Sequence, residues 1–159
     1  MRISRRDRRI EWLRVKIPPG VDTNSRVRLA GKGEAGTGGE SPGDLYIVTQ
    51  IRPHDYFTRE GDDLVCELPV TLAEAMLGAK IEVPTVDGKT TMVLPAGTQN
   101  SRQFRLRGKG VPHLKDSGRG DQYVTVKVVL PETLDTRSQE LVEEFDQRNP
   151  LQPRTQMKW

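Results

Sequence analysis

Two stretches of the sequence, IPPGVDTNSRVRLAGKG at 17–33 and LPAGTQNSRQFRLRGKG at 94–110, repeat one pattern at a constant offset of 77 residues. The correspondence continues without a gap to Ile51 and Val128. Most of the identical positions are turn formers, which are kept where the backbone needs a particular conformation. The repeat therefore indicates one backbone plan that is used twice in a single chain.

Length and composition favour two small domains. The 159 residues are enough for one domain or for two small ones, and the repeat favours two. Hydrophobic residues make up only 34% of the chain, so we expect thin cores. We predict an all-β protein with two consecutive small β-sandwich domains of similar design, the first one incomplete, each with little helix, followed by a C-terminal amphipathic helix.

Short alternating runs of apolar and polar residues predict the strands. In the first run, Leu13, Val15 and Ile17 alternate with polar or exposed neighbours and end at a Pro-Pro-Gly turn. Further strands are predicted within 26–33, 45–51, 64–70, 80–84, 90–94, 103–107 and 122–130.

Two helices are predicted from their capping signals. Thr71 and Glu74 form a capping-box pattern, and Gly78 ends that helix after Leu77. A second helix is predicted from Thr136, its capping residue, to about Gln147. Its apolar residues form one stripe, which either packs back onto the second sandwich or pairs with another copy of the chain. These residues are Leu141, Val142 and Phe145.

The predicted segments differ in charge. They are a basic arm at 1–11, the latter part of the first sandwich at 12–60, the second sandwich at 61–132, a C-terminal helix at 133–148 and a disordered tail at 149–159. The last residue of the tail, Trp159, has no predicted role. Residues 1–16 hold seven basic and two acidic residues, whereas the whole chain has a net charge of only +3. Nucleic-acid binding is therefore confined to the arm as an alternative function.

The sequence contains no signal for a disulfide, a metal site or a membrane span. Its single cysteine, Cys66, lies in an alternating run and is predicted to be a buried core thiol. The chain has no apolar run long enough to cross a membrane and no apolar stretch after its N-terminal arginines. We expect a cytoplasmic protein without a cofactor.

No catalytic motif is present. The two histidines, His54 and His113, lie far apart in loops, and neither is paired in sequence with a nucleophile. The two Gly-Lys-Gly triplets follow strands without opening a helix, so we interpret them as turns or bulges rather than phosphate loops. Two neighbouring aromatic residues, Tyr56 and Phe57, lie in a polar turn segment, where they either line a binding pocket or close the seam between the two units.

The stretches at 17–36, 43–88, 94–114 and 119–131 resemble the C-terminal substrate-binding region of the DnaJ family of heat-shock co-chaperones. The resemblance extends from Ile10 to Phe145. It implies a module that binds unfolded polypeptides without catalysis, passes them to a DnaK-type chaperone, and forms a homodimer through the C-terminal helix. It also implies that Leu13 and Phe57 belong to the peptide-binding pocket. Val15 and Ile47 are added to that site by strand alternation.

The sequence also departs from the family pattern. It has no helical J domain with His-Pro-Asp, no cysteine pairs for a zinc module, and no match to the strands that open the first sandwich. We therefore expect a part of a longer reading frame, in which residues 1–60 are less stable than residues 61–147 because open strand edges remain. A structural or ligand-binding sandwich without preference for unfolded chains is the other alternative function.

Overall fold

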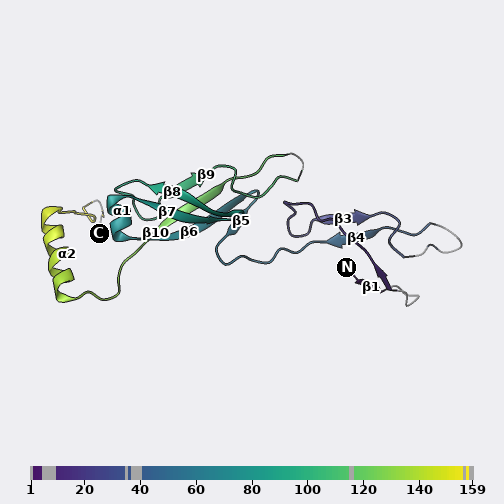
Figure 1. Cartoon of the computed structure of the whole chain (residues 1–159), viewed down its shortest axis with the longest axis horizontal. Coiled ribbons are helices and arrows are strands. Elements are labelled where there is room, and N and C mark those ends of the chain that lie inside the picture. The colour runs from purple at the N-terminus through teal and green to yellow at the C-terminus, as the bar shows by residue number, and fades with distance from the viewer. Residues whose placement is uncertain are drawn as a thin grey trace. The chain divides into compact units, whose positions relative to one another are not determined.

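The structure is a computed structural model that describes residues 2–4, 10–34, 36, 41–114, 117–155 and 157. The fold consists mostly of β-strands in several small sheets, with little helix (Figure 1). The chain divides into two compact units, Met1–Val128 and Val129–Trp159. The elements are β1 (Arg2–Ser4), β2 (Ile10–Trp12), β3 (Arg26–Leu29), β4 (Leu45–Val48), β5 (Thr58–Glu60), β6 (Asp63–Thr71), α1 (Leu72–Leu77), β7 (Ala79–Thr85), β8 (Gly88–Leu94), β9 (Gln103–Leu106), β10 (Gln122–Val129) and α2 (Thr136–Arg148).

The sequence repeat is a structural repeat. β3 and β4 form an antiparallel hairpin in which Arg28 is opposite Tyr46, and β9 and β10 form another in which Arg105 is opposite Tyr123. Each pair in the second hairpin lies 77 residues after the corresponding pair in the first. The sequence therefore predicted the shared backbone plan correctly.

The Gly-Lys-Gly triplets form turns, as predicted. The first glycine of each triplet, Gly31 or Gly108, has a φ of 65°, a left-handed conformation that glycine adopts without strain. The third glycine of each donates a backbone hydrogen bond to the glycine that opens the next repeated stretch: Gly33 to Gly43 at 2.7 Å, and Gly110 to Gly120 at 2.9 Å.

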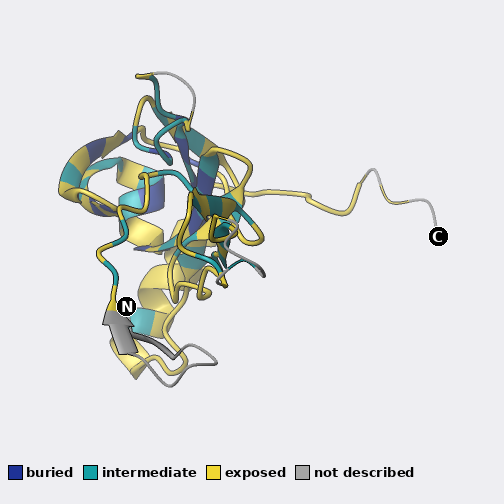
Figure 2. Cartoon of the chain, turned by 90° about the vertical axis from the view of Figure 1, so that its right-hand side faces the viewer, coloured by how far each residue is buried: buried dark blue, intermediate teal, exposed yellow. Residues whose placement is uncertain are grey.

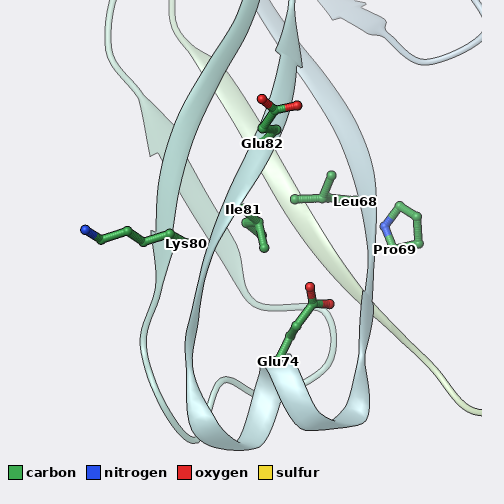
Figure 3. A pocket seen from close by; sticks show the side chains of 6 residues that line it. All are labelled: Leu68, Pro69, Glu74, Lys80, Ile81 and Glu82. Atoms are coloured by element: carbon green, nitrogen blue, oxygen red, sulfur yellow. The ribbon is translucent and has the colours of Figure 1, made fainter.

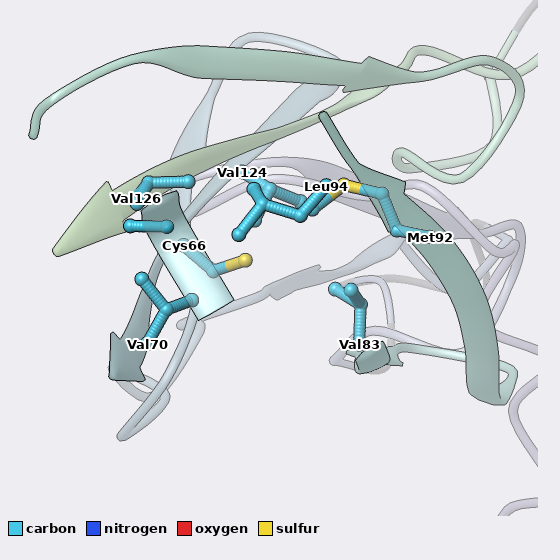
Figure 4. Close-up of a cluster of buried hydrophobic side chains, with 8 residues drawn as sticks. Cys66, Val70, Val83, Met92, Leu94, Val124 and Val126 are labelled. Carbon is cyan, nitrogen blue, oxygen red and sulfur yellow. The ribbon is translucent and has the colours of Figure 1, made fainter. Parts of the chain in front are cut away.

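The hydrophobic core lies between two sheets in the second half of the first unit. One sheet has the strand order β5-β6-β10-β9, and the other pairs β7 with β8. Cys66 is 3% exposed, as predicted for a core thiol, and burial raises the pKa of this thiol. Figure 4 shows the cluster in which it packs: Cys66, Val70, Ala75, Val83, Met92, Leu94, Val124 and Val126.

The first repeat has no such core. Among the described side chains of residues 12–60, none is buried, and the inward-facing residues of β3 and β4 are only half-buried (Figure 2). The buried side chains of the unit come from residues 64–126. The hydrophobic free energy that holds the unit together is therefore concentrated in the second repeat.

The strand predicted over 13–17 is wrong. β2 ends at Trp12, which is paired with Arg2, the first residue of β1, so the ladder has no further β1 residue to offer Leu13. The alternating burial persists for Leu13 and Val15, which are half-buried, but Ile17 is 53% exposed. The β1–β2 pair lies mostly within the segment predicted to be a basic arm.

The first helix has the predicted ends. The Thr71 side chain accepts a hydrogen bond from the Glu74 amide at 3.2 Å, and the Glu74 carboxylate accepts one from the Thr71 amide at 2.8 Å. This arrangement completes the capping box, and Gly78 is the C-cap of α1 after Leu77.

The capping residue of the second helix was predicted incorrectly. Asp135, not Thr136, is the N-cap of α2, and its carboxylate accepts a hydrogen bond from the Ser138 amide at 2.7 Å. Aspartate and threonine both cap helices, and here the carboxylate occupies the position that reaches the third helical amide. The helix ends at Arg148, one residue beyond the predicted end. The described residues after Asn149 form no helix or strand, and Trp159 lies outside the described residues.

Candidate functional site

The half-buried face of the β3–β4 hairpin carries one of the predicted site residues. Ile47 is opposite Val27, and Leu45 is opposite Leu29, so the four side chains form one apolar face. The opposite face of β4 is also apolar, and Tyr46 is 55% exposed. β4 is paired only with β3 among the described strands, so its other edge is open to an extended chain.

Phe57 lines a cavity of about 380 Å³ that involves both repeats. The ring of His54 packs against the Phe57 ring, with 4.9 Å between the ring centroids. Phe57 is half-buried and also packs against the core cluster, whereas Tyr56 is 69% exposed. The cavity is lined by Asp22, Thr23, Ile51, Arg52, Pro53, His54, Phe57, Arg59, Leu64, Val86 and Val111.

The sequence left two interpretations of Tyr56 and Phe57 open: they line a binding pocket, or they close the seam between the two units. Phe57 has features of both. Phe57 contacts the core, as expected for a residue that closes the seam, and it also lines a cavity, as expected for a pocket residue. The cavity does not include Leu13, Val15 or Ile47. Phe57 thus lines this cavity without the other three predicted residues.

Sequence reasoning missed most of the apolar lining of this cavity. Ile51 ends a predicted strand, so its periodicity gave some signal. Val86 lies in the turn between β7 and β8, and Val111 lies in a loop. No periodic pattern identifies either residue, because their position beside Phe57 depends on contacts between segments that are distant in sequence.

Hydrogen bonds attach the rim of the cavity to the base of the β3–β4 hairpin. The Ile51 amide donates to the Thr23 hydroxyl at 3.1 Å, and the Thr49 hydroxyl donates to the Asp22 carbonyl at 2.6 Å. The Tyr56 amide donates to Nδ1 of His54 at 3.1 Å, which fixes the imidazole beside Phe57. The cavity wall is therefore held by backbone contacts as well as by packing.

A second cavity, of about 320 Å³, lies in the second sandwich beside α1 (Figure 3). Leu68 of β6 and Ile81 of β7 form its apolar part. Its acidic side chains have partners, because Glu74 caps α1 and Glu82 forms an ion pair with Lys89 at 2.9 Å. No predicted site residue lines this cavity.

The titratable groups of the described residues do not form a reactive centre. His113 lies 3.7 Å from the Asp62 carboxylate, and His54 contacts two aromatic rings. Within the described ranges, no group of three or more His, Cys, Asp or Glu side chains could hold a metal ion. None of the described helices is long and apolar enough to cross a membrane.

Fold and site together define a class: a β-rich protein in which one hairpin plan is used twice, with a partly apolar cavity and an open strand edge as its candidate site. The sequence pattern of the DnaJ C terminal domain family matches residues 1–131, and the chain belongs to this family. The resemblance drawn from the sequence motifs is thereby confirmed.

The similar curated proteins are named as chaperones. The chain is 51% identical over 138 residues to the chaperone protein DnaJ of Bacillus cytotoxicus, and 49% identical to those of Bacillus mycoides and Bacillus cereus. Each alignment covers 87% of this chain. The chain spans 37–38% of the length of these relatives. The family is a chaperone family rather than an enzyme family, in agreement with the prediction of a non-catalytic protein.

Proposed function

We propose that this chain is the part of a DnaJ-type co-chaperone that holds unfolded or misfolded polypeptides through their apolar segments. The bound segments would pass to a DnaK-type chaperone in the cytoplasm. The observation that carries the proposal is the cavity at Phe57, which has apolar residues in its lining, in a chain that belongs to the DnaJ C terminal domain family.

An extended segment would use two kinds of contact. Its backbone would pair with the open edge of β4, and an apolar side chain would enter the cavity against Phe57. Burial of one such side chain contributes about 1.5–3 kcal/mol before the cost of ordering the segment. Leu13, Val15 and Ile47 would contact further apolar residues of the same segment, because all three are half-buried and present apolar surface.

We also propose that α2 forms the homodimer contact. The three residues of its apolar stripe are each about half exposed: Leu141 at 49%, Val142 at 50% and Phe145 at 46%. Pairing with the same stripe of a second chain would remove this surface from water. A dimer would present two polypeptide-binding sites, which raises the effective concentration of each site for one long unfolded chain.

The binding site is tested with Phe57→Ala and a permanently unfolded, reduced and alkylated protein as the ligand. We expect a loss of about 1–2 kcal/mol in binding free energy, roughly five- to thirtyfold in Kd, measured by fluorescence anisotropy. Leu77→Ala is the matched control, because Leu77 is 79% exposed and is not among the residues that line the cavity. Because Phe57 packs on the core, circular dichroism melts of both variants accompany the titrations. Ile47→Ala supplies a second site variant that leaves the core cluster intact. Wild-type affinity in both site variants would contradict the proposed site.

A further inference from the structure

The side chain of Arg59 connects β5 to the Pro-Pro-Gly turn and to Val21, the residue after it. Its Nη1 donates to the Val21 carbonyl at 2.7 Å, and its Nη2 donates to the Gly20 carbonyl at 3.0 Å. Its Nε donates to the Gly61 carbonyl at 2.7 Å. The side chain is only 20% exposed, and each of its three guanidinium nitrogens donates to a backbone carbonyl. Arginine suits this position because its planar fork presents several fixed donors at once.

The same turn is confined on its other side by backbone. Gly20 has a φ of +88°, and a Cβ atom added there would lie 2.0 Å from the Pro112 carbonyl oxygen. Only glycine fits this close approach. The turn is therefore held between the Arg59 guanidinium and the loop that contains Pro112.

The two repeats anchor this turn differently. In the second repeat, the amides of the equivalent residues Gly97 and Thr98 donate to the Met76 and Ala75 carbonyls of α1, at 3.1 and 2.9 Å. In the first repeat, the turn carbonyls instead accept hydrogen bonds from Arg59, which belongs to the four-stranded sheet of the second sandwich. Both copies of the turn are thus held by residues outside the repeat, the first by an arginine side chain and the second by backbone carbonyls.

The anchored turn leads directly into the wall of the Phe57 cavity. Asp22 and Thr23 follow the turn and line the cavity, as does Arg59 itself. Since Thr23 also accepts a hydrogen bond from the Ile51 amide, a displacement of the turn would move two parts of the lining together. The contacts of Arg59 are therefore made to a turn that is adjacent in the chain to part of the cavity lining.

We infer that Arg59 is a positioning residue for polypeptide binding: it holds the turn at Gly20 and Val21 in place and so keeps the Phe57 cavity preformed. This inference rests on the proposed function. A preformed cavity avoids the ordering cost that a mobile wall would add to each binding event. Arg59 acts through the backbone of the turn and needs no contact with the bound segment.

The test compares two perturbations of the turn, each with its own control in the full chain. Arg59→Gln removes most of the donors, and its control is Arg137→Gln, at an arginine side chain that is 73% exposed. Gly20→Ala disturbs the turn from the opposite side. Its control is Gly31→Ala, where φ is also positive at 65° but an added Cβ meets nothing within 4 Å. Affinity for reduced, carboxymethylated α-lactalbumin and amide hydrogen exchange are measured for all four variants.

We expect Arg59→Gln and Gly20→Ala each to weaken binding by about tenfold, because both release the cavity wall. Exchange of amides in residues 20–25 rises in both, while exchange in 64–71 and 122–128 stays unchanged, which separates a loose turn from an unfolded sandwich. Faster exchange at 20–25 with wild-type affinity would overturn the role of Arg59. If Phe57→Ala still weakens binding in that case, the proposed function stands without this inference. A wild-type chain that binds no unfolded protein overturns both.

Discussion

The carboxylate of Asp121 accepts hydrogen bonds from the Arg105 guanidinium and from the Gly108 amide, the latter at 2.7 Å. It thereby ties the turn after β9 to the start of β10. Asp44 makes the equivalent contacts in the first repeat, with Arg28 and with the amide of the corresponding glycine. The pKa of each carboxyl is lowered from its ordinary value of 3.8, chiefly by the backbone hydrogen bond and further by the arginine.

These carboxylates predict a loss of stability in acid. Because their folded pKa values lie below 3.8, the folded protein binds fewer protons than the unfolded chain in that range. Their contribution is complete above the unfolded value and disappears as the pH falls through the folded one. We expect Asp121→Asn to lower stability at neutral pH and to flatten the decline below about pH 4. Urea unfolding across this range measures both effects, with Asp55→Asn as the exposed control. An unchanged acid slope in Asp121→Asn would contradict the assignment.

Because the buried core lies in the second repeat, substitution by alanine should lower the unfolding free energy by different amounts at equivalent positions of the two repeats. Val124 is 0% exposed in the core cluster, whereas its counterpart Ile47 is only half-buried. We expect Val124→Ala to cost about 1–3 kcal/mol of unfolding free energy, since the cavity left behind cannot collapse fully. Ile47→Ala removes a larger side chain and yet costs less. Chemical denaturation of both variants provides the measurement, and a greater loss for Ile47→Ala would place the main core in the first repeat.

Local pattern identified much of the fold. The repeat predicted one backbone plan that is used twice, and the structure shows this plan as two hairpins of the same register. Alternating polarity located most of the strands of the second sandwich. The capping box at Thr71 was specified by residues three positions apart, so the sequence alone was sufficient. Such features depend on neighbours in the chain, and they are therefore visible in it.

The missed features depend on distant partners. β5 is only three residues long and exists because Thr58 is opposite Val65, which no periodicity in a turn-rich segment indicates. The predicted strand at 13–17 failed for the opposite reason, since alternation was present but β1 has no residue opposite Leu13. The lining of the cavity at Phe57 was likewise predicted only in part. The sequence indicated Phe57, because an aromatic residue is unusual in a polar turn segment, but it gave no sign that Val86 and Val111 line the same cavity.

No described side chain of residues 12–60 is buried, and this predicts an early site of proteolysis. The described apolar residues of that segment are half-buried or exposed, whereas β6 to β10 surround the buried cluster. We expect brief digestion with a nonspecific protease to produce a resistant fragment that begins near Gly61, because local opening is more frequent where few apolar groups are buried. Mass spectrometry of the fragment identifies its first residue. A resistant fragment that begins near Trp12 would show that the two repeats open as one unit.

The apolar stripe of α2 predicts a change of oligomeric state. Leu141 and Phe145 lie one helical turn apart on the same face and are each about half exposed. If they form the proposed homodimer contact, the double variant Leu141→Asp with Phe145→Asp places four like charges in the interface and yields monomers. Multi-angle light scattering over a range of concentrations measures the mass of each variant. Leu151→Asp is the control, since Leu151 is 82% exposed beyond the end of the helix and lies outside the stripe. Dimers that persist in the double variant would exclude α2 as the contact and direct attention to the open edge of β4.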